Sequence, residues 1–529
     1  MPTVTRLLQD HVTLTCECID RMYLNGYVPT LQTPGQLVRF YNDHRGQPIA
    51  SPILCGRQTA SFIQAVESFA TRYHIPIVHF PKHARKEAIA RKYFGRYRGS
   101  EGVVLIGVAQ ERMRGFRATK VAAGQFSWTR QPVCVNHYYF YLRDRDFGPA
   151  FIKIGTYLPF PIKVWLNGHE WVKRQLEHAR IPYRSLDNGI LSVADPARCQ
   201  ALCDTLSADH VEACVRKWLR RLPHPFTAAD RRAGYRYHLS VIQLEVSATH
   251  IFQRPLQGRQ FFEEVLREHL DLGRPEQVQL VFGRKVTRAT PGPFRTRLIT
   301  HEVDPSLSIF YKHSKLKQYL KEGKALRTEL TINDPWDFHV RKSLRHLGYL
   351  RELGQHITRR LLASERVSQD CAPTEALFHQ VILPSTHDGL RAPGLRFGEP
   401  RVMALLSALC AFVHLVDGFT NRDLRGRVAA LLTPTPETYT AARMTYDLRR
   451  LRRKGFIYRL PNRNRYVVRA KGRRIALFFS KSYIRILRPG LSACDPALPP
   501  DPPTPLAHAF HQLDHTITAL VQEAHLMAS

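Results

Sequence analysis

The segment between residues 440 and 490 constrains the fold most, because its apolar residues and turns follow one another in a fixed order. Met444, Leu448 and Leu451 recur at spacings of four and three residues, which predicts one buried stripe along a helix. Gly455 stands where helices commonly end in a left-handed residue. The elements expected after it are a strand over 456–460, a strand over 466–469 and a helix over 472–487.

Two further helices are expected before this unit. Residues 401–413 form an apolar run that predicts the first helix. Thr420 and Asp423 have the spacing of a capping box, which predicts the start of a second helix that ends near Leu432. Thr440 can cap the third helix. The order is therefore three helices, a two-stranded hairpin and a final helix.

The same region is strongly basic. Between Ala442 and Ile475 there are thirteen Lys and Arg residues and one acidic residue, Asp447. With the apolar stripe of the third helix facing inward, its arginines are expected to point mostly outward, where only a polyanion would neutralise them. The expected nucleic-acid-binding residues of this region are Arg443, Arg449, Arg450, Arg452, Arg453, Lys454, Arg463 and Arg465.

Residues 400–490 resemble the winged helix-turn-helix family of DNA-binding domains. The run MTYDLRRLRRKGFIYRLPNRNRYVVRAKGRRIA matches the family's recognition helix, Gly turn and wing. The resemblance implies that the third helix enters a major groove and that Arg463 and Arg465 meet phosphate or the minor groove. Many winged helices bind proteins instead, but an Arg-dense face without acidic partners favours DNA or RNA.

The whole-chain composition agrees with a polyanion as partner. The chain has 529 residues, 44% of them hydrophobic, which indicates three or four folded domains. Its formal net charge of +34 indicates a nucleic-acid ligand. A membrane surface is the rival polyanion, but the longest apolar stretch, residues 402–416, is too short to span a bilayer. The first residues lack the layout of a signal peptide, so a cytoplasmic location and reduced cysteines are expected.

The fold class expected is multidomain α/β and α+β, with an N-terminal α/β layer, a central mixed sheet domain and a C-terminal winged helix. In residues 1–130, helices at 60–73 and 82–94 alternate with apolar strands at 75–80 and 102–108, which suggests a small parallel sheet. A structural layer is favoured over a nucleotide site, because neither GxGxxG nor a P-loop is present. The other expected divisions are an α+β domain at 131–234, a basic β-hairpin and helical domain at 235–367, a linker at 368–399, the winged helix at 400–490, and a Pro-rich spacer with a C-terminal helix at 491–529.

Two patterns could bind metal. Asp144 and Asp146 stand two residues apart, but the flanking arginines favour solvated or ion-paired carboxylates. Cys16-x-Cys18 and Cys199-x3-Cys203 could be halves of a metal site. Neither pair has a matching pair at zinc-finger spacing, so ordinary buried or surface thiols are favoured.

The third division carries a basic hairpin and a candidate catalytic segment. Lys317-x-Tyr319-x-Lys321 precedes Leu326-Arg327-x-Glu329 in residues 311–333. This segment resembles the replication initiators of rolling-circle phages and plasmids. The resemblance implies that Tyr319 attacks a phosphodiester, that Glu329 holds Mg²⁺ or Mn²⁺, and that Lys321 balances charge. The initiators' metal motif, two histidines flanking an apolar residue, is absent, so a binding surface is the favoured alternative. The other basic residues expected to bind nucleic acid are Arg284, Arg288, Arg295, Arg297, Lys315 and Lys317.

Taken together, the sequence predicts a nucleic-acid-binding protein that favours DNA over RNA. The chain also resembles a family of uncharacterised bacterial proteins, which implies no activity. The leading hypothesis is DNA binding in a mobile-element or replication-type system, with metal-dependent strand nicking as a further activity. The alternatives are a non-enzymatic RNA-binding protein that stabilises or packages a structured RNA, and a transcriptional regulator.

Overall fold

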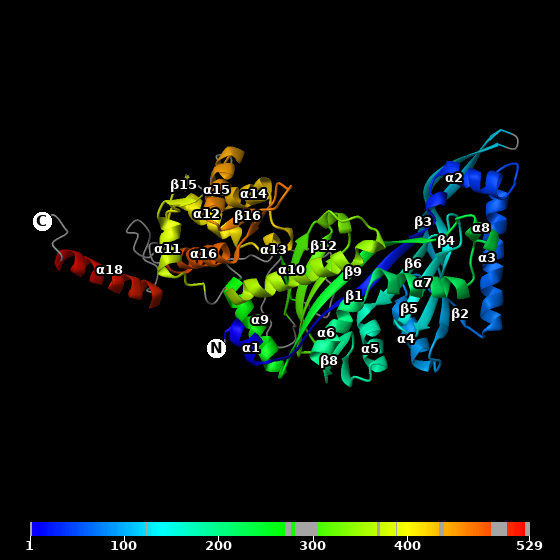
Figure 1. Cartoon of the computed structure of the whole chain (residues 1–529), viewed down its shortest axis with the longest axis horizontal. Coiled ribbons are helices and arrows are strands. Elements are labelled where there is room, and N and C mark those ends of the chain that lie inside the picture. Colours follow the sequence, from blue (N-terminus) through cyan, green and yellow to red (C-terminus); the bar gives the residue numbers. More distant parts are fainter. Residues whose placement is uncertain are drawn as a thin grey trace. The chain divides into compact units, whose positions relative to one another are not determined.

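The computed structural model describes residues 3–122, 125–269, 277–280, 305–367, 371–387, 389–432, 439–487 and 505–523 (Figure 1). The chain divides into two compact units. Unit 1 is Met1–Gln9, Gln260–Val278 and Arg360–Ser529, and unit 2 is Asp10–Arg259 and Gln279–Arg359. Helices and strands occur in both units, so the expected multidomain mixed α/β class is confirmed at that level.

One sheet of eleven strands organises the first two thirds of the chain. Its order is β10-β11-β12-β13-β9-β1-β6-β5-β4-β3-β2. The strands of this sheet are β1 (Val12–Tyr27), β2 (Ile77–His79), β3 (Gly102–Ala122), β4 (Gln125–Asp144), β5 (Gly148–Gly155), β6 (Ile162–Asn167), β9 (His238–Phe252), β10 (Gln277–Leu280), β11 (Pro305–Tyr311), β12 (Ser314–Lys321) and β13 (Ala325–Ile332). A separate hairpin joins β7 (Tyr183–Leu186) to β8 (Gly189–Val193).

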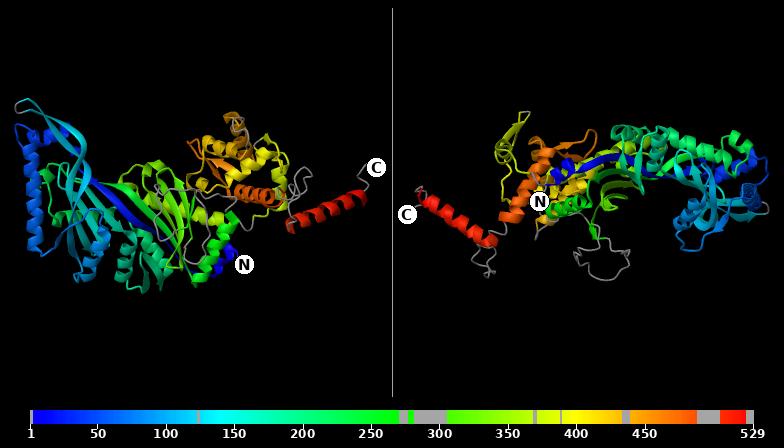
Figure 2. Two further views of the ribbon diagram at one scale, coloured as in Figure 1. Left: turned by 180° about the vertical axis from the view of Figure 1, so that it is seen from behind. Right: turned by 90° about the horizontal axis from the view of Figure 1, so that it is seen from below.

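The expected N-terminal parallel sheet is present only as one pair of strands. β2 pairs with β3 in parallel, whereas the pairs of β3 with β4, β4 with β5 and β5 with β6 are antiparallel. β3 and β4 also pair far beyond the end of β5 and form a long two-stranded ribbon (Figure 2). Strands from all three expected N-terminal divisions therefore contribute to a single sheet.

Unit 2 also contains seven α-helices within the described residues. They are α2 (Pro34–Arg39), α3 (Pro52–Arg72), α4 (Lys86–Arg96), α5 (Gly168–His178), α6 (Pro196–Thr205), α7 (Ala208–Arg221) and α8 (Ala228–Arg232). Of these, α2, α4, α5 and α6 pack against strands of the sheet. Three helices cross a unit boundary: α1 (Val4–Asp10), α9 (Pro255–His269) and α10 (Leu347–Val367). Gly354 of α10 lies against Val246 of β9, where an added Cβ would come within 2.6 Å of the valine side chain.

A free stretch of β1 is covered by α6. β6 pairs with β1 only from Arg21 onward, so the earlier residues of β1 have one unpaired edge. Gln200 of α6 fills this edge: its side-chain oxygen accepts the Glu17 backbone N–H at 2.9 Å, and its side-chain nitrogen donates to the Glu17 carbonyl at 2.9 Å. One glutamine side chain thus replaces a strand at this point.

Unit 1 contains a second core. The helices and strands of unit 1 that follow α10 are α11 (Glu375–Ile382), β14 (Ser385–His387), β15 (Leu390–Ala392), α12 (Pro400–Leu409), α13 (Val413–Asp417), α14 (Asn421–Leu431), α15 (Ala441–Arg453), β16 (Ile457–Arg459), β17 (Tyr466–Val468), α16 (Ala470–Lys481) and α18 (Pro505–Glu523). Met444, Leu448 and Leu451 are buried in this core, as their spacing predicts. Val381 and Leu395 belong to the same core, so residues expected to be a linker are partly folded.

The helix starts expected at Thr420 and Thr440 are confirmed, whereas the single helix expected over 401–413 is instead two helices, α12 and α13. Thr420 and Asp423 form a capping box at α14, and the Thr440 side chain accepts the Arg443 N–H at the start of α15. Gly455 has a φ of 69°, the left-handed conformation that glycine adopts without a Cβ clash. In the described part of the chain, every helix is too short or too polar to span a lipid bilayer.

Candidate nucleic-acid interface

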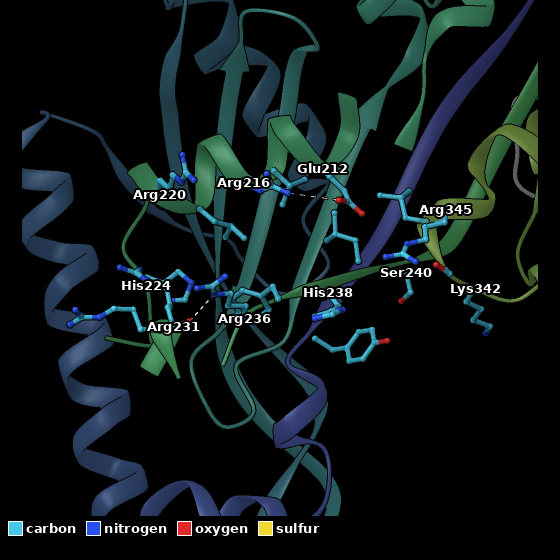
Figure 3. Close-up of a pocket in the computed structure, with 18 of the residues that line it drawn as sticks. Glu212, Arg216, Arg220, His224, Arg231, Arg236, His238, Ser240, Lys342 and Arg345 are labelled. Carbon is cyan, nitrogen blue, oxygen red and sulfur yellow. Dashed lines mark hydrogen bonds and ion pairs between the residues drawn. The ribbon is translucent and has the colours of Figure 1, made fainter. Parts of the chain in front are cut away.

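A wide cavity in unit 2 begins at one face of α7 (Figure 3). Glu212, Arg216 and Arg220 follow one another at intervals of four residues, so they share this face. The opposite face is buried, and there the Trp218 indole N–H donates to the Asp144 carboxylate at 2.6 Å. This bond fixes the rotation of α7 and directs its arginines into the cavity.

The second wall comes from α8 and the start of β9. Thr227 and Asp230 form a capping box at α8, and the buried Asp230 carboxylate also accepts a 2.6 Å bond from Arg45. These contacts set the position of Arg231 and Arg232, which line the cavity together with Arg236.

The third wall is the segment 342–345, which lies beside β9. Ser240 and Ser343 form an isolated antiparallel bridge, and the Val241 N–H donates to the Lys342 carbonyl at 2.7 Å. The backbone pairing brings Lys342 and Arg345 to the cavity, although Lys342 follows the end of α7 at Arg221 by 121 residues.

Positive charge dominates the lining. The cavity has a volume of about 1530 Å³, and its lining holds seven Lys or Arg side chains and one carboxylate, Glu212. The neutralising contacts are weak: Arg216 lies 3.9 Å from Glu212, and Lys342 lies 3.4 Å from Asp334. The like charges on such a surface repel one another unless an anion screens them. The seven basic residues are Arg216, Arg220, Arg231, Arg232, Arg236, Lys342 and Arg345.

Histidine and aromatic rings are interspersed among these charges. Burial, with a smaller contribution from the neighbouring Arg231, lowers the pKa of His224 to about 4, so this ring is neutral at pH 7. Tyr237 is held by a 2.6 Å hydrogen bond from its hydroxyl to the Phe160 carbonyl. The rings of Tyr27 and His238 lie 6.4 Å apart at the cavity. Flat rings among cations are the usual components of a surface that binds bases and phosphates.

This cavity was not predicted from the sequence. The available signal was the density of arginines at 216–221 and 231–236. Their convergence with residues 342–345 depends on the pairing of Ser240 with Ser343, which no local pattern reveals.

The basic helix of unit 1 is less exposed than expected. Arg443, Arg449, Arg452 and Arg463 are exposed. Arg450 is buried, and its guanidinium donates to the carbonyls of Pro393 and Gly394. The expectation that Arg450 points outward is therefore wrong.

Three more residues of the expected set have internal partners. Lys454 is fully buried and donates to the carbonyls of Gln380 and Leu383 at 2.8 and 2.9 Å. Arg465 forms a 3.1 Å ion pair with Asp417, and Arg453 donates to the Arg391 carbonyl at 2.8 Å. The missed signal is the polar 368–399 segment, which supplies the backbone carbonyls for Arg450, Arg453 and Lys454.

Of the six remaining expected basic residues, two lie among the described residues. Arg284, Arg288, Arg295 and Arg297 lie outside the described residues. Lys315 and Lys317 are half-buried on β12, and the Lys317 ammonium lies 4.3 Å from the centre of the Tyr319 ring. Their side chains share a face of the sheet with Tyr319.

The candidate catalytic residues do come together on β12 and β13. The Tyr319 hydroxyl donates to the Glu329 carboxylate at 2.8 Å, and Lys321 donates to the Asn188 carbonyl at 3.4 Å. Burial raises the pKa of Tyr319, and the Glu329 carboxylate raises it further. This environment opposes formation of the phenolate that would attack a phosphodiester.

Arg327 occupies the centre of this cluster. Its guanidinium lies 2.6 Å from Asp20, 2.8 Å from Glu329 and 2.6 Å from His169 Nε2, and its side chain is completely buried. Burial alone would raise the pKa of Asp20, but the charge of Arg327 holds it at about 2. Burial lowers the pKa of His169 to about 3, so a neutral ring accepts the arginine N–H. The Arg327 cation therefore already neutralises Glu329, the residue that was expected to hold a metal.

Among the described residues, the structure does not place Glu329 in a cluster of potential metal ligands. Within the described ranges, the one group of three closely spaced potential metal ligands is Cys16, Cys199 and Cys203, and Glu329 is not part of it. Asp144 is likewise engaged in a 2.6 Å ion pair with Lys217. The ion-paired alternative for Asp144 is confirmed.

The protein is therefore a mixed α/β chain that contains a strongly basic cavity. Comparison with family models, curated proteins and solved structures found no match for this chain.

Proposed function

We propose that this chain binds nucleic acid, with DNA as the favoured ligand, through the basic cavity of unit 2. The observation that carries the proposal is the excess of positive charge in one cavity. Seven Lys and Arg side chains from three separate segments line it, and only one carboxylate is among them. Phosphate contacts by such side chains supply most of the sequence-independent affinity for nucleic acids.

The size of the cavity favours a polymer over a metabolite. Small-molecule pockets usually enclose about 300–1000 Å³ and are mainly apolar. This cavity is larger, at about 1530 Å³, and its arginines stand on all three walls. Repeated phosphates would satisfy several walls at once, whereas a single phosphate would leave most of the charge unscreened.

The exposed arginines of α15 offer a second basic surface, which lies in unit 1. Arg443, Arg449 and Arg452 line the helix, and Tyr446 is 45% exposed among them. The resemblance of this region to winged helices is the reason to place duplex DNA first. By that resemblance, α15 is the helix that would enter the major groove.

Strand nicking is the less favoured part of the hypothesis. Tyr319 donates to Glu329, and Glu329 lies against Arg327, so neither residue is poised for metal-assisted attack. We expect no cleavage of labelled DNA in Mg²⁺ or Mn²⁺. Cleavage that disappears in Tyr319→Phe would restore the nicking hypothesis and contradict this assignment.

The binding experiment measures the affinity of the full chain for labelled duplex DNA, single-stranded DNA and RNA over a series of salt concentrations. In the triple variant Arg220→Ala, Arg232→Ala and Arg345→Ala, the log–log salt slope should fall by about 2–3, because each phosphate contact contributes about 0.7–0.9.

A matched control removes the same charge elsewhere in unit 2. Arg57, Arg72 and Arg117 are exposed and outside the cavity, so their alanine triple variant should keep the slope within about one contact. Equal losses in both variants would mean that charge alone matters and that the cavity is not the site. Tighter binding of RNA than of DNA would favour the RNA-binding alternative.

A further inference from the structure

Four cysteines meet at the contact between β1 and α6. Cys16 and Cys18 lie on one face of β1, and Cys199 and Cys203 lie one turn apart on α6. The Sγ atoms of Cys16 and Cys203 are 3.6 Å apart, and those of Cys16, Cys199 and Cys203 all lie within 4.8 Å of one another. The sequence showed these two pairs but not that they meet.

The spacing of the sulfur atoms matches a metal site better than a disulfide. A disulfide holds its sulfurs about 2.05 Å apart and uses two thiols. In a tetrahedral zinc site with Zn–S bonds of about 2.3 Å, the sulfurs lie about 3.8 Å apart. The observed 3.6 Å and the third sulfur within 4.8 Å fit the second arrangement.

The fourth thiol is close to the other three. Cys18 is fully buried, its Sγ donates to the Ile19 carbonyl at 3.0 Å, and its thiol interacts with that of Cys203. Cys18 Sγ lies outside the group of three mutually close sulfurs, so its side chain would have to change rotamer to become the fourth ligand. One ligand pair would then come from the strand and one from the helix.

The surroundings suit a structural metal. All four cysteines are at most 3% exposed, which leaves no open coordination position for a substrate. Two hydrogen bonds between Gln200 and the Glu17 backbone hold α6 on β1, and each of these residues stands between the two cysteines of its own pair in the sequence. Asp195 caps α6 by accepting the Arg198 N–H at 2.9 Å, so the helix that carries Cys199 has a fixed start.

We propose that Cys16, Cys18, Cys199 and Cys203 bind one Zn²⁺ ion, which fastens α6 to β1. This site is independent of the proposed nucleic-acid binding. Its role is structural, because the ligands are buried and thiolate-rich, as in closed zinc sites.

The first experiment measures the metal content of the full chain purified without chelators or added metal. The expected result is one zinc per chain, and Co²⁺ exchanged into the site should give the thiolate-to-cobalt charge-transfer absorption. Absence of zinc together with absence of the cobalt band would overturn the proposal, and so would a disulfide between Cys16 and Cys203 found by mass spectrometry under non-reducing conditions.

Variants locate the site. Cys16→Ser and Cys203→Ser should each lose the bound zinc, whereas Cys214→Ser, which alters a buried cysteine on α7, should retain it. Because a ligand variant can fail to fold, chelation of the unaltered chain gives an independent measurement. Removal of zinc should lower Tm, and zinc, but not Mg²⁺, should restore it. Equal zinc content in all three variants would place the metal elsewhere.

Discussion

The Arg327 guanidinium lies 2.6 Å from the Asp20 carboxylate, although 307 residues separate them in the chain. β9 makes this contact possible, because it pairs with β1 on one side and with β13 on the other. Both side chains are almost completely buried, so the pair is shielded from solvent. An uncompensated charge at this point would be costly.

We predict that Arg327→Met destabilises the chain by about 3–5 kcal/mol, because Asp20 and Glu329 lose their buried cation. Urea unfolding of unit 2 measures this loss. Arg21 is the matched control, since it lies 3.9 Å from Asp20 but is 51% exposed. Arg21→Met should cost less than about 1 kcal/mol. Similar losses of unfolding free energy in the two variants would mean that burial does not strengthen the contact between Arg327 and Asp20.

Glu245 gives a prediction about pH. Burial raises its pKa to about 7, with Asp20 adding to the effect, whereas an exposed Glu titrates near 4.5. The folded state therefore favours the protonated carboxyl, and this stabilisation is complete below pH 4.5 and is lost as the pH rises through 7. Glu245→Gln, which stays neutral, should match the parent chain at pH 4 and be more stable at pH 8.

The size of this gain follows from the pKa shift. One pKa unit corresponds to about 1.4 kcal/mol, so a shift from 4.5 to about 7 gives a gain of about 3–4 kcal/mol at pH 8. Thermal unfolding at pH 4 and pH 8 measures it. Glu87 is 80% exposed, and Glu87→Gln should show no such dependence. A gain that is independent of pH would contradict the assigned protonation.

Arg449 and Arg450 are neighbours on α15 with different expected roles. Arg450→Ala should destabilise unit 1 by about 1–3 kcal/mol, because the carbonyls of Pro393 and Gly394 lose a buried donor. Arg449→Ala should change stability by less than about 0.5 kcal/mol. If α15 contacts DNA, Arg449→Ala should reduce the salt slope by about 0.7–0.9. Comparing unfolding with DNA titration for the two variants separates these roles.

Gly472 of α16 tests the packing of unit 1. An added Cβ would collide with the carbonyl oxygen of Phe456, which is backbone and moves with difficulty. Gly472→Ala should therefore cost about 1–3 kcal/mol. Gly426 of α14 has no neighbour that a Cβ would meet, and Gly426→Ala should stabilise the unit by about 0.4–1 kcal/mol. Chemical denaturation of both variants tests the difference in sign.

The sequence predicted local structure better than it predicted the site. The spacing of Met444, Leu448 and Leu451 and the cap at Thr440 predicted α15 because both signals lie within one helix. The outward orientation of Arg450 was predicted wrongly, since its partners belong to a segment more than fifty residues earlier in the chain. Long-range pairing determines which polar groups a side chain meets, and one sequence does not show it.

The cysteines show the same limit. Cys16-x-Cys18 and Cys199-x3-Cys203 were visible, but each pair was incomplete when considered alone. Only the packing of α6 against β1 brings their sulfurs together. The cavity arginines likewise converge through the bridge between Ser240 and Ser343.

The side chain of Gln200 has a consequence for solubility. An uncovered strand edge can recruit a strand from another molecule and begin aggregation. Because Gln200 satisfies both backbone groups of Glu17, the early part of β1 cannot offer them to an incoming chain. At Glu17, therefore, a single side-chain amide closes the strand edge to a foreign strand.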